Sequence, residues 1–189
     1  MKRTIYMLAL ISLISGCASN NLSVKTDPYS GDKVVSSNFF YSLTPFNKWR
    51  EIDRIVFKYD YIGKSNMFVL RAGYLTGAGA YTGLREGIVN VDRLGFMIDG
   101  KEQTFQPATT TNYDGVNACN EIGICAPADG SYSSFAIPIS LLSEIEKAQT
   151  VKVKLLLGNH QKVAILKSGD DLSDAYDMLV KFDSTITKM

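Results

Sequence analysis

Residues 55–61 alternate between two kinds of side chain, and this alternation constrains the fold more than any other feature of the 189-residue chain. Every second position is apolar or aromatic, namely Ile55, Phe57, Tyr59 and Tyr61. Because successive side chains of a β-strand point to opposite faces, this spacing predicts a strand with an aromatic stripe on one face. The same period recurs at Phe68, Leu70, Ala72 and Tyr74, so a second strand is expected there.

The next part of the chain carries the signals of a β-hairpin. Apolar runs at 88–91 and 94–98 precede Asp99-Gly100, and extended sequence continues over 101–105. Both central residues of a type I′ turn have positive φ, which Asp-Gly tolerates well. The sequence therefore predicts a tight hairpin at Asp99-Gly100.

Strands and helices are both expected in the second half. A short strand at 135–137 ends at Pro138, and residues 150–157 and 162–166 flank a predicted turn at 158–161, which indicates a second hairpin. Helical spacing predicts a helix at 141–148 with Ser140 as its N-cap. A last helix is expected over 170–182, capped by Ser168 or Asp170, with a buried stripe of Leu172, Ala175, Tyr176, Leu179 and Phe182.

Together these signals predict a mainly β fold. We expect an antiparallel, β-sandwich-like domain with two short helices, and an α+β fold is the alternative. Residues 37–189 are expected to form this single domain. Residues 17–36 are rich in Ser, Asn, Lys, Asp and Gly and are expected to form a tether, although Val24–Val35 has enough apolar residues to add a first strand.

The amino terminus has the parts of an export signal. Lys2 and Arg3 precede the apolar run 5–13, which leads into Ile14-Ser15-Gly16-Cys17. This segment resembles the signal peptides of bacterial lipoproteins. An ordinary signal peptide with an incidental cysteine, or an uncleaved membrane anchor, are the alternatives, but the run is shorter than the ~20 residues that span a bilayer.

The resemblance implies how the protein is held. Segment 1–16 would be removed, and Cys17 would become the lipidated first residue, so that the acyl chains hold the protein at a membrane without a transmembrane helix. In Gram-negative members of this family an aspartate after the cysteine tends to retain the protein in the inner membrane. Because Ala18 follows Cys17 here, the outer membrane is expected, on either its periplasmic or its outer face.

The two remaining cysteines are close in sequence. Cys119 and Cys125 flank Asn120-Glu121-Ile122-Gly123-Ile124, and an even pair in an exported protein predicts a disulfide that closes a small loop. Redox activity and metal binding are the weaker alternatives. The spacing is not that of a Cys-x-x-Cys motif, and the chain has one histidine.

The charge pattern argues against two classes of partner. Removing Lys2 and Arg3 with the leader would turn 20 basic residues into 18 against 19 acidic ones, a net charge of −1. Charges of both signs are mixed along the chain without a basic block. Neither nucleic-acid binding nor attraction to an anionic lipid surface is therefore expected from the charge pattern.

Candidate sites are few. The glycine-rich run 73–83 lacks the endings of phosphate-binding loops, so we expect a loop between strands in which Tyr74 and Tyr81 could contact a ligand or peptide. Asp170, Asp171, Asp174 and Asp177 are interpreted as a solvated helix face, since the EF-hand pattern is missing. His160 is expected in an exposed turn, with no catalytic role.

These observations lead to a functional expectation. The protein is expected to be a non-catalytic envelope lipoprotein that binds an envelope protein or serves as an accessory component, with the 73–83 loop and the 119–125 ring as candidate surfaces. No metal and no cofactor are expected. The alternatives are a carboxylate-dependent hydrolase of envelope glycan, peptidoglycan or lipid, and a carrier of a small apolar ligand.

Overall fold

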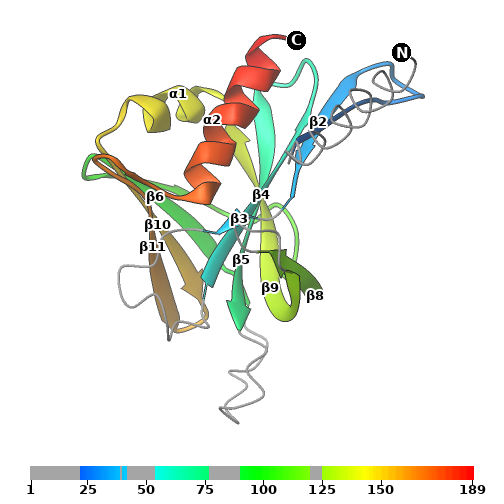
Figure 1. Cartoon of the computed structure of the whole chain (residues 1–189). Helices are drawn as coiled ribbons and strands as arrows, with labels where there is room; N and C mark the ends of the chain where they lie inside the picture. Colours follow the sequence, from blue (N-terminus) through cyan, green and yellow to red (C-terminus); the bar gives the residue numbers. More distant parts are fainter. Residues whose placement is uncertain (1–21, 39, 42–53, 77–89, 120–124) are drawn as a thin grey trace, which may run out of the picture.

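The computed structural model describes residues 22–38, 40–41, 54–76, 90–119 and 125–189 (Figure 1). These residues form two antiparallel sheets and two helices, so the predicted antiparallel, sandwich-like fold with two helices is confirmed. Within the described part of the chain, no helix combines the length and the hydropathy needed to span a bilayer.

The seven-stranded sheet has the order β1-β2-β4-β5-β9-β8, and β3 pairs with β4. Its strands are β1 (Leu22–Thr26), β2 (Lys33–Ser37), β3 (Phe40–Tyr41), β4 (Arg54–Ile62), β5 (Met67–Thr76), β8 (Asn112–Cys119) and β9 (Cys125–Pro138). The five-stranded sheet has the order β12-β11-β10-β6-β7. Its strands are β6 (Arg93–Ile98), β7 (Lys101–Phe105), β10 (Thr150–Leu157), β11 (His160–Ser168) and β12 (Asp171–Leu172).

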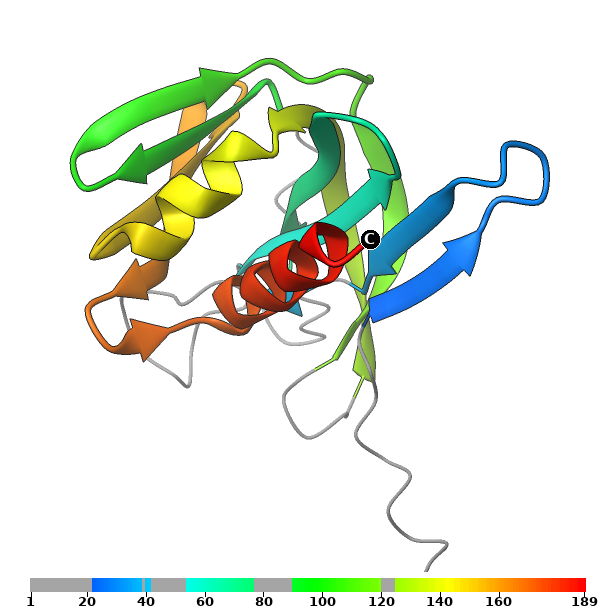
Figure 2. The same ribbon diagram turned by 90° about the horizontal axis from the view of Figure 1, so that it is seen from above.

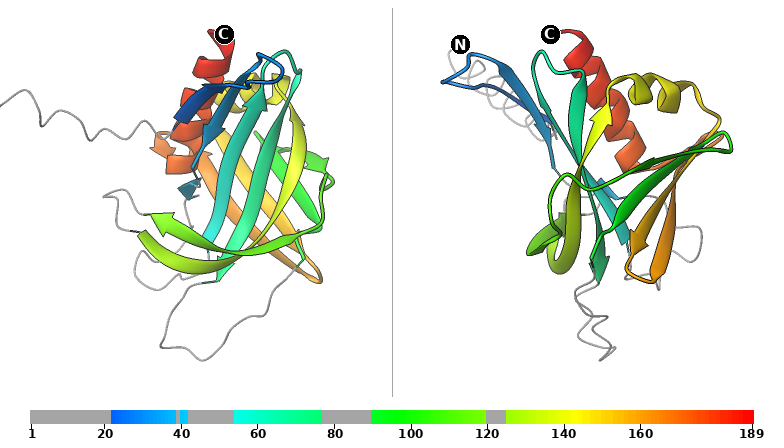
Figure 3. Two further views of the ribbon diagram at one scale, coloured as in Figure 1. Left: turned by 90° about the vertical axis from the view of Figure 1, so that its right-hand side faces the viewer. Right: turned by 180° about the vertical axis from the view of Figure 1, so that it is seen from behind.

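The helices α1 (Ser140–Lys147) and α2 (Asp174–Thr187) lie between the two sheets. The sheets approach each other at the lower end of Figure 1 and diverge above, where the helices fill the opening (Figures 1 and 3). The hairpin formed by β1 and β2 stands away from this body, as the view from above shows most clearly (Figure 2). One sheet edge is therefore presented apart from the core.

The predicted aromatic stripe forms the inner face of the large sheet. Tyr59 lies beside Leu70, which lies beside Phe135, and all three side chains are buried. Leu94, Phe96, Val153 and Leu155 of the small sheet belong to the same core. The alternation of apolar and polar residues thus records which face of each strand packs inward.

The Asp99-Gly100 hairpin is confirmed in detail. Asp99 has φ 45° and Gly100 has φ 83°, as a type I′ turn requires, and Ile98 pairs with Lys101. The Asp99 carboxylate accepts hydrogen bonds from the amides of Thr150 (2.8 Å) and Gln149 (3.0 Å). The turn therefore also holds the start of β10.

Two helix starts differ from the expectation. The last helix begins at Asp174, and its cap is Ser173, whose hydroxyl accepts from the Tyr176 amide at 3.1 Å. Ser168 and Asp170 do not cap it, because β12 pairs with Lys167 and Ser168 before the helix begins. Leu172 is consequently exposed rather than part of the buried stripe.

The first helix contains Ser140 instead of being capped by it. The N-cap is Ile139, and no side chain caps this helix. Pro138 ends β9, and Ile139 is the one residue between that strand and the helix. Leu141, Leu142 and Ile145 of this helix are buried, as its helical spacing requires.

Strand bounds also differ in the first half and in β9. From Leu22 onward, the stretch expected as a tether forms the β1–β2 hairpin, in which Val24 pairs with Val35. The short strand expected at 135–137 is the end of the 14-residue β9. Residues 90–92 are not in a strand, and 88–89 lie outside the described residues.

The Asp99 contacts predict a pH-dependent stability. Hydrogen bonds from the Thr150 and Gln149 amides lower the pKa of Asp99. A lowered pKa in the folded state means that the contribution is present above the unfolded pKa of about 3.9 and is lost as the pH falls through the folded value. Asp99→Asn, which keeps a residue tolerant of positive φ, should therefore unfold at lower urea than the parent at pH 7 but at nearly the same urea near pH 2.

Asp170→Asn, in an exposed turn, serves as the control and should change little at either pH. A deficit of Asp99→Asn that is the same at both pH values would contradict the assignment.

Candidate functional site

The candidate site begins at an irregularity between β2 and β3. Ser36 lies opposite Asp60 in β4, and pairing resumes where Phe40 lies opposite Phe57. The chain therefore takes four steps on one side and three on the other, which is the residue count of a β-bulge. Bulges interrupt the ladder locally and change where side chains point.

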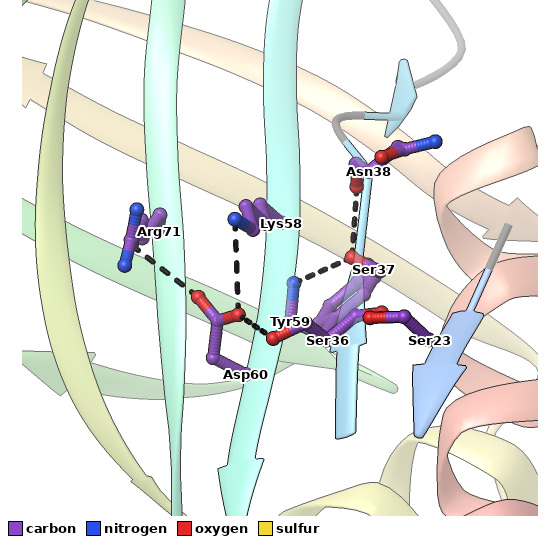
Figure 4. A network of polar contacts seen from close by, with 8 residues as sticks. All are labelled: Ser23, Ser36, Ser37, Asn38, Lys58, Tyr59, Asp60 and Arg71. Atoms are coloured by element: carbon purple, nitrogen blue, oxygen red, sulfur yellow. Dashed lines mark hydrogen bonds and ion pairs between the residues drawn. The ribbon is translucent and has the colours of Figure 1, made fainter. Parts of the chain in front are cut away.

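Ser37 supplies the hydrogen bond that the ladder loses at this point. The Tyr59 amide donates to Ser37 Oγ at 2.8 Å in a buried setting, and Ser37 Oγ donates to the Asn38 carbonyl at 2.8 Å (Figure 4). A buried amide without a partner would be costly, so this serine stabilises the irregular backbone.

A charged network lies next to the bulge on the outer face of the large sheet. Asp60 accepts from Ser36 Oγ at 2.6 Å, Lys58 Nζ lies 3.8 Å from Oδ1, and Arg71 Nε lies 3.3 Å from Oδ2 (Figure 4). One half-buried carboxylate is thus shared by two cations. The network carries a net charge of +1.

A shallow pocket of about 330 Å³ opens beside this network. Its lining is polar except for one residue and consists of Ser23, Lys25, Val34, Ser36, Ser37, Asn38 and Lys58. Two of these residues are lysines, and none carries a carboxylate. Among the described residues, Lys25 has no ion pair within 4.0 Å, so its charge adds to the excess at the site.

A second polar cluster joins the two helices to β11. Lys167 Nζ donates to the Glu146 carbonyl and to the Tyr176 hydroxyl, both at 3.2 Å. Burial first, and then the charge and hydrogen bond of Asp183, raise the pKa of the Glu146 carboxyl. The two carboxyls of a glycosidase stand about 5 Å or more apart. Because the Glu146 and Asp183 carboxyls are hydrogen-bonded to each other, they suit a contact between the helices better than hydrolysis.

Tyr74 does not lie in an exposed loop as expected. It belongs to β5, is 3% exposed, faces the core, and has Lys162 Nζ 4.9 Å from its ring centre. The alternation that predicted the strand also assigns Tyr74 to the inner face. Tyr81 and the rest of the loop from residue 77 lie outside the described residues.

The other predicted residues are distributed over the molecule. Cys119 pairs with Cys125 across the β8–β9 hairpin, a separation that suits a disulfide in the backbone geometry of opposed strands. The disulfide itself stays a prediction, and Cys17 lies outside the described residues. His160 is exposed at the start of β11.

The four aspartates do not converge. Asp170 and Asp171 precede the last helix, and Asp174 and Asp177 lie in its first turn. The described residues contain no group of three or more histidine, cysteine, aspartate or glutamate side chains that could hold a metal ion.

Sequence reasoning missed the pocket. Lys58, Asp60 and Arg71 occupy the polar positions of two predicted strands, so their common face could have been expected. Strand pairing sets the register that brings Ser23, Ser36 and Asp60 into one row, and no pattern within a few residues predicts that register.

Comparisons with protein-family models, with curated proteins and with solved structures found no match for this chain.

The bulge predicts that replacing two nearby serines by alanine lowers the free energy of unfolding by unequal amounts. Ser37→Ala leaves the buried Tyr59 amide without its acceptor and should lower the free energy of unfolding by about 1–3 kcal/mol. Ser23→Ala, at an exposed position on β1, should change it by less than about 0.5 kcal/mol. Urea unfolding followed by far-UV circular dichroism measures the free energy of unfolding of both variants. Equal midpoints for the two variants would argue against this role of Ser37.

The Cys119–Cys125 pairing predicts a redox-dependent stability. Without reductant, neither thiol should react with an alkylating reagent, as read by peptide mass spectrometry. Reduction should cost about 2 kcal/mol, the chain-entropy value for so small a loop. The double variant Cys119→Ser, Cys125→Ser should be insensitive to reductant, and alkylation of both cysteines in the exported, untreated protein would rule the bond out.

Proposed function

We propose that the protein is a lipid-anchored, non-catalytic binding protein of the bacterial outer membrane, held by a lipid on Cys17. The observation that carries this proposal is the position of the polar pocket. It lies on the hairpin whose first strand begins at Leu22, five residues after Cys17. An anchored chain would thus present its pocket close to the membrane.

Chain length limits how far the pocket could be from the lipid. Ser23 lies six positions after Cys17, and an extended chain spans at most about 3.6 Å per position. The reach is therefore at most about 22 Å. Since the hairpin also stands away from the body of the fold (Figure 2), it offers a partner a surface beside the membrane.

The chemistry of the pocket supports binding rather than catalysis. Ser37 donates its hydroxyl hydrogen to the Asn38 carbonyl, which is not a base that could activate it, and Ser36 donates its own to the Asp60 carboxylate. Asp60 is contacted by Ser36, Lys58 and Arg71. Two cations therefore balance the one carboxylate beside Ser36, and the pocket offers a partner charges and hydrogen bonds.

The hairpin tip offers a way to test the partner surface in cells. Tyr29 is 98% exposed at the tip, and Val163 is 47% exposed on the outer face of the small sheet. A photo-crosslinking amino acid at position 29 should capture a specific envelope component, and the same probe at position 163 should not. Cys17→Ser should release the protein from the membrane fraction and abolish the capture at position 29.

Two results would overturn the proposal. One is retention of the Cys17→Ser protein in the outer membrane. The other is capture of the same set of proteins from positions 29 and 163, which would show that the hairpin binds no specific partner.

A further inference from the structure

We infer that the pocket between β1, β2 and β4 is a binding site for a phosphate group. The charges around the pocket are unbalanced. Lys25, Lys58 and Arg71 stand against the single carboxylate Asp60 around the pocket, which leaves an excess of two positive charges among these groups. An unbalanced cationic pocket that is open to solvent favours an anionic ligand.

Strand register explains how the two lysines can act on one ligand. Ser23 of β1, Ser36 of β2 and Asp60 of β4 form one row across the sheet. Lys25 lies two residues beyond Ser23 along β1, and Lys58 lies two residues from Asp60 along β4, in the direction of the bulge. The lysines therefore flank the serine row from opposite sides, and their long side chains can converge above it.

The kinds of donor favour phosphate over carboxylate. A carboxylate is matched by the planar fork of an arginine, and Arg71 already directs its Nε to Asp60 at 3.3 Å. The pocket lining contains no arginine, and its charged groups are the two lysine ammoniums, accompanied by three serines and the exposed Asn38. Lysines bind phosphate as point charges, and their several N–H groups can serve different oxygens of a tetrahedral anion.

The remaining lining residues fit a phosphate ester. Val34 supplies one apolar wall, which suits the carbon next to an ester oxygen. Asp60 would repel an anion if it faced the pocket alone, but Ser36 at 2.6 Å and Arg71 offset its charge. We assign Asp60 the role of a positioning residue that holds Lys58 and Ser36.

The phosphate could belong to a lipid headgroup or to a free ester, since the pocket recognises the same chemistry in both. For the membrane source the inference rests on the proposed function, because the anchor would bring the pocket to the headgroups. For a free ester it stands alone. Its test therefore uses residues 18–189, which lack Cys17 and contain all the described strands and helices.

The test has two arms. In the first, binding of inorganic phosphate, glycerol 3-phosphate and acetate is measured by NMR titration. In the second, co-flotation is measured with vesicles of phosphatidylcholine, with and without phosphatidic acid. We expect saturable binding of the phosphate probes, no competition by acetate, and a phosphatidic acid dependence of flotation if the headgroup is the ligand.

Three variants identify the site. Lys25→Gln, at an exposed position, and Lys58→Gln should each weaken binding about tenfold or more, as expected for the loss of a charged hydrogen bond. Lys152→Gln removes the same charge from an exposed position on the outer face of the small sheet and should leave binding unchanged. Because Lys25 has no ion pair in the described fold, its variant stays informative even if Lys58→Gln is destabilised.

Several outcomes would overturn the inference: no phosphate binding in either arm, equal competition by acetate, or equal losses in Lys25→Gln and Lys152→Gln. If the Cys17→Ser protein stayed in the membrane, that result would contradict the proposed function and would leave the phosphate titration unaffected. Phosphate binding without flotation assigns the site to a free ester.

Discussion

The packing of α2 between the two sheets is the contact on which the rest of the structure depends. The Phe182 ring lies 5.6 Å from the rings of both Tyr59 and Phe68, so the last helix covers strands from the first half of the chain. The Tyr59 hydroxyl donates to the Ala175 carbonyl at 2.8 Å. Burial raises the pKa of Tyr59, which keeps this hydroxyl a donor at any physiological pH. Without the helix, the inner faces of both diverging sheets would be open to water.

That packing also decides what lies on the outer face. A strand places neighbouring residues on opposite sides, so burying Tyr59 beneath α2 directs Lys58 and Asp60 outward. Arg71 reaches the same face because it lies opposite Lys58 in β5. The charged network and the pocket beside it are therefore a geometric consequence of the core. The bulge after Ser36 adds the exposed Asn38 amide and the Ser37 contact that stabilises the break.

Much of the fold was predictable because its signals are local. The β4 and β5 strands, the Asp99-Gly100 turn and the pairing of β10 with β11 follow from periods and turn residues within a few positions. The start of α2 was not predictable, because β12 takes Asp171 and Leu172 into a sheet edge before Ser173 can cap the helix. Tyr74 was assigned to a binding loop from the neighbouring glycines, whereas its place in the alternating stripe indicated burial.

The sequence by itself determined the β periodicity, the inward aromatic stripe and the hairpin turns, since side-chain alternation and positive φ are properties of neighbouring residues. It also carried the lipoprotein-like leader, on which the proposed anchoring rests. Only the tertiary structure decided that Leu22–Ser37 extends the sheet and that Ser23, Ser36 and Asp60 share one row. Such rows join residues up to 37 positions apart in the chain through strand pairing. Pairing depends on which faces the core buries, and no local pattern specifies that choice.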